Sequence, residues 1–394
     1  MSSEAIAQAP AAEAERFQTD RVLTIAGAHA VHDTYTAFLP PLLPTFIDTL
    51  SLSTTQAGLL SVFLQTPSLL QPFIGHMADH ISLRYFLILA PGVTAIMMSL
   101  LGVAPSYAVL AVLLIVAGFS SASLHAVAPV MAGNLSGRNL GRGMGFWMVG
   151  GELGRTIGPI AIVSAIQFMS LNGSPWLMAG GILASLILYV QFKDVAGRPP
   201  NAGQGLPWWQ AIRGMGSFLI PLVAIIVVRA FMVASLTTYL PTFLSQEGAN
   251  LWFAGASLSV LEAAGVVGAL LGGSLSDRWG RPRVLLFSLL TTTSFMFLFL
   301  RASGWARFPI LLVLGFTALS VTPVIMALVQ ENVPENRALA NGIYMAINFT
   351  IQSGAIVLVG ALGDMFGLRL AFTVSAIIPL LGVPFIFLLP RRTP

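Results

Sequence analysis

Residues 145–159 read GFWMVGGELGRTIGP and place two charged side chains inside an apolar, glycine-rich run. Glu152 and Arg155 are three residues apart, so they share one face of a helix. A charge at the centre of a bilayer costs about 3 kcal/mol even on the lenient insertion scale, so this pair should face protein or water. Trp147 and Met148 look suited to hydrocarbon. We therefore expect a membrane helix whose charged face borders a protected interior.

The composition of the whole chain supports this interpretation. Of the 394 residues 56% are hydrophobic and only 9% are charged, and the mean hydropathy is +0.84. An ordinary soluble domain carries about 25% charged residues, so the chain is a polytopic membrane protein. It has no cysteine, which excludes disulfides and thiolate chemistry. Residues 1–20 lack the basic start of a cleavable signal peptide, so we expect the first apolar run to be retained.

A spanning helix needs about 20 mostly apolar residues, and counting such runs predicts twelve spans. They lie at 22–44, 55–78, 85–103, 107–132, 143–168, 175–192, 217–244, 252–276, 284–301, 308–330, 340–363 and 370–389. The long polar connection between the sixth and seventh spans divides them into two sets. We expect an N-terminal tail at 1–20, a six-helix bundle at 21–192, a linker at 193–216, a second bundle at 217–390 and a short tail at 391–394.

Short matches between the two halves recur at nearly one offset and suggest an internal duplication. They are PTF at 44–46 and 241–243, Gly and Asp four apart at 75–79 and 273–277, and Gly145 with Gly342. The fold class we predict is an all-α membrane protein with twelve transmembrane helices in two pseudo-symmetric six-helix bundles.

The basic residues predict the orientation in the membrane. Most of the nineteen fall on the side of the termini if the spans alternate. The opposite side holds Arg301, Arg307 and Arg369, and Arg155 and Arg229 lie inside helices. The positive-inside rule then places both termini in the cytoplasm of a cell whose plasma membrane, in bacteria the inner membrane, holds the protein.

Ionisable residues within the spans follow a three-helix period. They are His29, His32 and Asp33 in span 1, His125 in span 4, Glu152 and Arg155 in span 5, Arg229 in span 7 and Glu262 in span 8. Spans 3, 6, 9 and 12 have none within their cores. Such a pattern is typical of a bundle whose outer helices meet lipid while the others surround a wet centre.

Two loops carry a resemblance to a known family. The loop after span 2 contains Gly75, Asp79 and Arg84, and the loop after span 8 contains Gly273, Asp277, Arg278 and Arg281. The second copy resembles the cytoplasmic signature Gly-x-x-x-Asp-Arg-x-Gly-Arg of the major facilitator superfamily, and the resemblance extends over residues 20–390. It implies two six-helix halves that work by alternating access, with these loop residues acting in gating.

The spacing of Gly145, Gly154, Gly158 and Pro159 resembles the span 5 motif of the superfamily's drug and proton antiporters. Residues 29–44, 71–72 and His125 look most like the fosmidomycin-resistance group of exporters. The span 4 arginine of the superfamily is Leu114 here, so no proton relay runs through that position. Glycines on spans 5 and 8 are expected to let helices pack closely where the two halves meet.

We expect substrate contact or proton coupling from His29, His32, Asp33, His125, Glu152, Arg155, Arg229 and Glu262. Asp33 is the first choice for proton exchange and Glu152 the second. Several alternatives remain open: a capped polar cluster around Asp33, a static Glu152–Arg155 ion pair, and a buried His125 bonded to Ser121. Arg229 either neutralises Glu262 or binds an anionic group. A His-x-x-His-Asp metal site is a further alternative, but we expect no metal and no cofactor.

Polar residues at helical spacing predict a lined cavity. They are Gln65 on span 2 and Asn341, Tyr344, Asn348 and Gln352 on span 11. The alternative is an interhelical seam.

The function that the sequence favours is proton-coupled efflux of a small organic molecule by a monomeric transporter in a lipid bilayer. An importer or facilitator of an anionic metabolite is the alternative, motivated by Arg155 and Arg229. A membrane-embedded enzyme or a non-transporting receptor is disfavoured, because no Ser/His/Asp set and no nucleotide-binding loop is recognisable by spacing. We expect no nucleic-acid partner.

Overall fold

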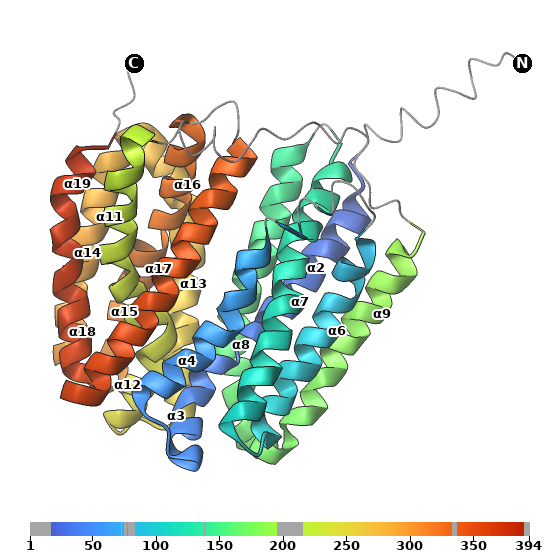
Figure 1. The fold of residues 1–394 in the computed structure, drawn as a ribbon, viewed down its shortest axis with the longest axis horizontal. Helices are drawn as coiled ribbons and strands as arrows, with labels where there is room; N and C mark the ends of the chain where they lie inside the picture. The colour runs from blue at the N-terminus through green and yellow to red at the C-terminus, as the bar shows by residue number, and fades with distance from the viewer. Residues whose placement is uncertain are drawn as a thin grey trace, which may run out of the picture.

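The computed structural model describes residues 17–71, 73–74, 77, 83–137, 139–194, 216–332 and 337–389, and in these residues it is helical without strands. Residues 1–16 of the predicted N-terminal tail, the C-terminal tail 391–394, most of the linker 193–216, and the predicted gating residues Gly75 and Asp79 lie outside the described residues. Figure 1 shows two groups of long helices standing side by side.

The first group contains the N-terminal helices. They are α2 (Thr19–Thr36), α3 (Leu39–Leu50), α4 (Thr54–Gln65), η1 (Thr66–Leu70), α6 (Arg84–Ser99), η2 (Leu100–Val103), α7 (Tyr107–Asn134), α8 (Leu140–Met169), η3 (Leu171–Leu177) and α9 (Met178–Phe192). The chain turns at residues 37–38, and Pro40 at the second position of α3 lacks the N–H that a continuous helix would need. The first predicted span is therefore built from two helices.

The second group contains the C-terminal helices. They are α11 (Gly216–Val233), η4 (Ala234–Tyr239), α12 (Leu240–Gln246), α13 (Leu251–Trp279), α14 (Arg281–Arg301), η5 (Gly304–Ala306), α15 (Arg307–Leu319), α16 (Val321–Asn332), α17 (Arg337–Phe366), α18 (Leu368–Ile377), η7 (Ile378–Gly382) and α19 (Val383–Phe387). Each group packs around its own buried apolar clusters.

Within the described residues, nine segments are long and apolar enough to cross a bilayer. The other three predicted spans correspond to α2 with α3, α4 with η1, and α8. Each of these carries interior polar residues such as His29, Gln65 or Glu152, which lower its apolar average. The architecture is an all-helical membrane fold and agrees with the twelve spans expected from the sequence.

The two groups meet through α4 with α17 and through α8 with α13. Figure 1 shows the groups converging at the end that holds α3 and α12, whereas α2 begins and α19 ends at the opposite end. At the converging end the Asp364 carboxylate of α17 accepts hydrogen bonds from the backbone N–H groups of Thr54, at 2.5 Å, and Thr55, at 3.0 Å. These are N-terminal donors of α4 that the helix itself leaves without partners.

Glycines show how tight this end is. A Cβ placed on Gly58 or on Gly360 would collide with the hydroxyl of Tyr239, which donates a 2.8 Å hydrogen bond to the carbonyl of Ile356. A Cβ on Gly354, further along α17 towards the other end, would meet nothing within 4 Å. The halves are therefore closely packed at one end and more open along α17 away from it.

The glycines of α8 pack against α2, inside the N-terminal half. A Cβ on Gly154 would lie 2.8 Å from the Cβ of Asp33, and one on Gly158 would lie 2.7 Å from that of Ala37. Glycines of α13 likewise face α15: Gly272 lies against Ser320. Helices α8 and α13 do meet between the halves, as expected, but the glycines of these stripes do not form that contact, which places Gly255 of α13 against Val163 and Pro159 of α8. Gly145, expected to aid packing, faces open space.

This seam gives a first testable prediction. We expect Gly154→Leu to reduce the yield of folded protein and lower its apparent melting midpoint, because the new side chain would push α2 away from α8. Overpacking of this kind costs about 1–3 kcal/mol. The matched control is Gly145→Leu on the same helix, which has nothing within 4 Å to displace. Equal melting midpoints for the two purified variants would contradict the packing described.

Candidate functional site

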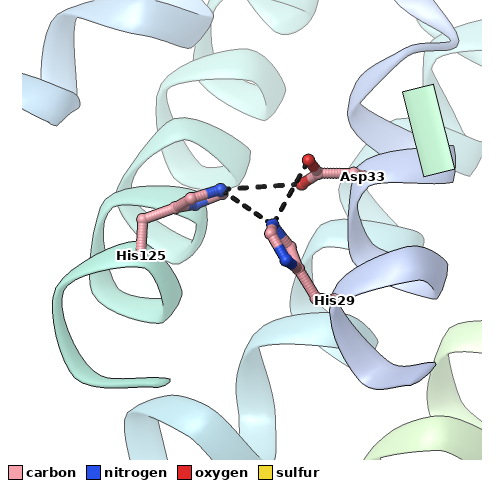
Figure 2. Close-up of side chains that lie close together, drawn as sticks. All are labelled: His29, Asp33 and His125. Carbon is pink, nitrogen blue, oxygen red and sulfur yellow. Dashed lines mark hydrogen bonds and ion pairs between the residues drawn. The ribbon is translucent and has the colours of Figure 1, made fainter. Parts of the chain in front are cut away.

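The structure brings His29, Asp33 and His125 together (Figure 2). His29 and Asp33 lie one turn apart on α2, and His125 projects from α7. The Nε2 of His29 lies 3.2 Å from Nε2 of His125 and 3.4 Å from Oδ2 of Asp33. The Nε2 of His125 lies 3.8 Å from Oδ1 of Asp33. Two helices thus direct three ligand-type atoms at one centre.

Backbone carbonyls fix the tautomer of both histidines. The Nδ1 of His29 lies 2.9 Å from the carbonyl oxygen of Trp147, and the Nδ1 of His125 lies 2.9 Å from that of Ser121. A carbonyl oxygen only accepts, so we assign the hydrogen of each ring to Nδ1. Each neutral ring then presents a bare lone pair on Nε2. The two lone pairs face each other beside a carboxylate, an arrangement that attracts a cation.

The bond between His125 and the Ser121 carbonyl bears on one of the alternatives that the sequence left open, a His125 bonded to Ser121. His125 is bonded to Ser121, one turn earlier on α7, through the backbone carbonyl. The Ser121 hydroxyl lies 3.4 Å from Nδ1. Because that nitrogen donates its hydrogen to the carbonyl, it has no lone pair with which to take a proton from the hydroxyl. Ser121, His125 and Asp33 are therefore not arranged as a nucleophilic triad.

Helix α8 forms one wall of the cluster. The ring of Trp147 stacks on that of His29, with centroids 3.5 Å apart and planes inclined by 13°. Trp147 is only 6% exposed, so the expectation that it contacts hydrocarbon is wrong. A Cβ on Gly151 would lie 2.8 Å from Nε2 of His29 and 3.1 Å from Oδ2 of Asp33. Only glycine leaves space for the cluster at this position.

His32 is completely buried beside the cluster but is not part of it. Its ring centroid lies 5.8 Å from that of His125, and among the described residues neither ring nitrogen makes a hydrogen bond of normal geometry. The three-atom centre is therefore His29–Asp33–His125, and the His-x-x-His-Asp arrangement suggested by the sequence does not form.

One turn further along α8, Arg155 connects the two halves. It forms an ion pair with Glu152 on its own helix, as the spacing predicts, and its Nε lies 3.8 Å from Oε2 of Glu262 on α13. Glu262 is 8% exposed, whereas 46% of the Arg155 side chain is accessible. One guanidinium is therefore shared between a carboxylate of its own half and a carboxylate of the other half.

Arg229 lies elsewhere, inside the C-terminal half. Its Nη2 donates to the carbonyl of Ala318 at 3.1 Å and to the hydroxyl of Thr322 at 2.9 Å. The idea that Arg229 neutralises Glu262 is wrong, because Glu262 has Arg155 as its partner. Arg229 borders a partly open pocket whose other lining residues are largely apolar, among them Ile225.

The polar residues predicted to line a cavity lie in different surroundings. Tyr344 is 1% exposed and belongs to a buried apolar cluster of the C-terminal half, so its expected place on a cavity wall is wrong. Asn348 and Gln352 are half-buried on the same helix. The side chain of Asn341 is outside the described part of the chain. Gln65 is half-buried where α4 passes into η1, and its Oε1 has no partner among the described residues.

The loop signature after α13 forms a connected set of bonds. Arg281 pairs with Asp277 at 2.6 Å and with Glu331 of α16 at 2.9 Å, and it donates to the carbonyl of Gly273 at 3.3 Å. Arg278 is exposed. The guanidinium of Arg281 thus joins the end of α13 to α16 within one half. In the first loop only Arg84 is described, with its guanidinium over the ring of Tyr85.

A family model for the Major Facilitator Superfamily matches residues 25–352 and 263–394. The chain belongs to this superfamily. Among curated relatives, the fosmidomycin resistance protein of Escherichia coli K12 is 24% identical over 375 residues, covering 93% of this chain and 91% of the relative. The uncharacterized MFS-type transporter YfnC of Bacillus subtilis 168 is 26% identical and covers 94% and 92%.

Solved structures of the superfamily share the fold. A bacterial homolog of the human lysosomal transporter Spinster, in an inward-facing and unoccupied conformation, superposes with a TM-score of 0.79 at 16% identity, covering 95% of this chain and 97% of the other. The nucleoside transporter NupG, solved as a point mutant, gives 0.74 at 14% identity, covering 94% and 99%. These likenesses show the fold of the chain.

For this superfamily member, sequence reasoning missed three residues as partners: Trp147 beside His29, Glu331 beside Arg281, and Asp364 at the start of α4. Glu331 and Asp364 each follow directly after a predicted span, 308–330 and 340–363, where a carboxylate usually meets only water. An acidic residue at the end of one span together with unpaired helix N–H groups at the start of another is the signal that could have identified Asp364.

Proposed function

We propose that this superfamily transporter exports a small organic molecule in exchange for protons, by alternating access between its two halves. The observation that carries the proposal is Arg155, whose guanidinium is shared by Glu152 in one half and Glu262 in the other. An ion pair that crosses a moving interface is made in one state and broken in another. Its partners are therefore suited to link conformation to protonation.

Opening of the closely packed end would separate α8 from α13 and take Glu262 away from Arg155. Among the described residues, the charged groups that face Glu262 are Arg155 and Glu152 of α8. A carboxylate left in this setting is costly as an anion, so it neutralises by binding a proton. Closure would return Arg155 and release that proton. Glu152 lies on the same helix as Arg155 and stays paired with it, so it holds the guanidinium in place while Glu262 is away.

The proton gradient supplies enough energy for useful export. One proton crossing 100 mV yields about 2.3 kcal/mol. This corresponds to a concentration gradient of about fortyfold, since about 1.4 kcal/mol is a factor of ten.

The relatives support the proposed direction and cargo. The Escherichia coli relative is named for fosmidomycin resistance, and resistance by a transporter fits removal of a small organic compound from the cell. Import of an anionic metabolite loses support, because the two arginines that motivated it already have partners: Arg155 has two carboxylates, and Arg229 has a carbonyl and a hydroxyl. An enzymatic role finds no nucleophile with a free base at Ser121.

The proposed orientation follows the basic residues. Arg142 lies over the ring of Phe17, just before α2 begins. Arg278 and Arg283 flank the turn between α13 and α14, at the opposite end of α14 from Arg301. Arg369 pairs with Glu247, just after α12, and donates to the carbonyl of Leu300, next to Arg301. By the positive-inside rule the end where α2 begins is cytoplasmic. The closely packed end then faces the outside of a bacterial inner membrane, and we infer a protein that functions as a monomer.

Glu262→Gln tests the proton coupling. We expect this variant, in proteoliposomes, to lose transport driven by a pH gradient while it still exchanges labelled substrate across the membrane. The neutral amide keeps the shape but neither binds nor releases a proton. The substrate would come from a thermal-stabilisation screen that includes fosmidomycin, and pyranine inside the vesicles would report proton movement.

The control for this assay is Asp48→Asn, which changes an exposed carboxylate at the end of α3. It should retain gradient-driven transport. Full proton-driven transport by Glu262→Gln would reject the coupling role of the Arg155 pair.

A further inference from the structure

We infer that His29, Asp33 and His125 form a binding site for one divalent transition-metal ion of the zinc type. This centre lies within the N-terminal half, apart from the Arg155–Glu262 contact, and the inference does not depend on the proposed transport function. The ligand set is two imidazoles and one carboxylate, which are the groups that zinc and cobalt accept in proteins. The chain offers no thiolate, and hard ions such as Mg²⁺ and Ca²⁺ prefer sites built from oxygen alone.

The spacing of the three atoms fits a single ion. Zinc lies about 2.0–2.1 Å from its nitrogen and oxygen ligands, so adjacent ligands of a tetrahedral site are about 3.3 Å apart. The Nε2 atoms of His29 and His125 are 3.2 Å apart, and the Asp33 oxygens are 3.4 Å and 3.8 Å from them. Small rotations of the carboxylate would equalise these edges.

The hydrogen bonds that orient the two histidines are those expected at a preformed metal site. Metal-binding histidines almost always donate their other ring N–H to a carbonyl, carboxylate or water, which orients the ring and frees the second nitrogen. Both histidines here donate from Nδ1 to a backbone carbonyl, of Trp147 and of Ser121. The stacked ring of Trp147 further fixes His29. Without a cation, two bare lone pairs would remain opposed at 3.2 Å, which is unfavourable.

Charge balance points the same way. With both rings neutral, the Asp33 carboxylate is the one charge of the three-atom centre, and it lies buried inside a membrane protein, where unbalanced charge is expensive. A bound cation would offset it.

The site also has an access path. The side chains of His29 and Asp33 are each 5% exposed, whereas that of His125 is 31% exposed. An ion would therefore reach the centre past His125, and a fourth ligand such as water would bind on that side.

The test uses purified protein from which any histidine tag has been removed, titrated with Co²⁺ and followed by visible absorption and calorimetry. We expect one Co²⁺ per chain, displaced by Zn²⁺ but not by Mg²⁺. Asp33→Asn and His125→Gln should each weaken binding by at least about tenfold to a hundredfold, the range seen even for outer partners of metal sites. His32→Gln, the neighbouring histidine outside the centre, should retain the stoichiometry.

A second readout does not need the ligand variants and compares wild-type protein with Trp147→Phe, whose ring can still stack on His29. Trp147 stacks on His29, so bound Co²⁺ should quench a part of the tryptophan fluorescence that Trp147→Phe protein lacks. No Co²⁺ bound by the wild-type chain, or binding unchanged in both ligand variants, would overturn the metal site. The first result would leave the centre as a proton-binding cluster. Neither result would bear on Glu262→Gln, so failure of this inference is distinguishable from failure of the proposed function.

Discussion

Arg155→Ala is expected to abolish transport in proteoliposomes and to reduce the yield of folded protein. Removing the guanidinium leaves Glu262, which is 8% exposed, without its partner and with Glu152 on the facing helix. Breaking one side of a buried ion pair costs about 3–5 kcal/mol. Because about 1.4 kcal/mol is a factor of ten, we expect the ratio of folded to unfolded protein to fall by at least about a hundredfold. Transport by the folded molecules should be lost because no guanidinium returns to Glu262.

Two further variants separate a role in folding from a role in transport. The double variant Arg155→Ala/Glu262→Gln leaves no unpaired anion on α13, so its yield and melting midpoint should recover towards the wild type, while gradient-driven transport stays absent. Arg301→Ala, an exposed arginine at the end of α14, serves as the control and should transport normally. A double variant as poorly folded as Arg155→Ala would show that the pair with Glu262 is not what the arginine stabilises.

Much of the fold can be predicted from sequence patterns that do not depend on which helices pack together. Apolar runs of about 20 residues must cross the membrane whatever they contact, and an interior charge such as Glu152 must avoid lipid. The intrahelical pair Glu152–Arg155 could be predicted because residues three apart always share a helix face. These properties depend on the chain alone, and the structure agrees with them.

The composition of the three-atom centre His29–Asp33–His125 could not be predicted, because it depends on how the helices are rotated against one another. His29, His32 and Asp33 are within about one turn of α2, and the sequence does not say which two face inward. The contact with α8 decides this: Gly151 and Gly154 admit the side of α2 that bears His29 and Asp33. His125 then completes the centre from α7, ninety-six positions away from His29.

The glycine stripes illustrate the same limit. A row of small residues predicts that some helix will approach closely, but it does not name that helix. Gly154 faces α2 and Gly268 faces α15, each inside its own half. The resemblance to other superfamily members placed these stripes between the halves. The actual contact there uses Gly255, which no motif identifies.

Asp364→Ala is expected to shift the protein towards a state that is open at the α3 and α12 end. Asp364 acts as an N-terminal cap for α4 from the other half, accepting from the N–H groups of Thr54 and Thr55 and from the Thr55 hydroxyl. Loss of a cap costs about 1–2 kcal/mol. We therefore expect the ratio of open to closed molecules to rise about fivefold to thirtyfold.

The absence of native cysteine makes this shift measurable, because spin labels can be attached at two introduced cysteines alone. Asp48→Cys at the end of α3 and Met365→Cys at the end of α17 place labels on opposite halves, both at exposed positions. Electron paramagnetic resonance should show the longer of two distances gaining population in Asp364→Ala. Thr55→Val, which removes only the hydroxyl bond, should give a smaller gain.

Asp364→Asn distinguishes hydrogen bonding from charge as the source of the closure. Asparagine caps helices about as well as aspartate does, but its single oxygen can replace only Oδ1, which accepts from the Thr54 N–H. A variant close to wild type would mean that this one N–H bond holds the end together. A distance distribution like that of Asp364→Ala would instead assign the effect to the carboxylate charge at the positive end of α4 or to the two bonds that Oδ2 accepts from Thr55, and Thr55→Val reports the hydroxyl bond separately. If Asp364→Ala itself leaves the distances unchanged, closure rests on the packing of Tyr239 against Gly58 and Gly360, and the cap is incidental.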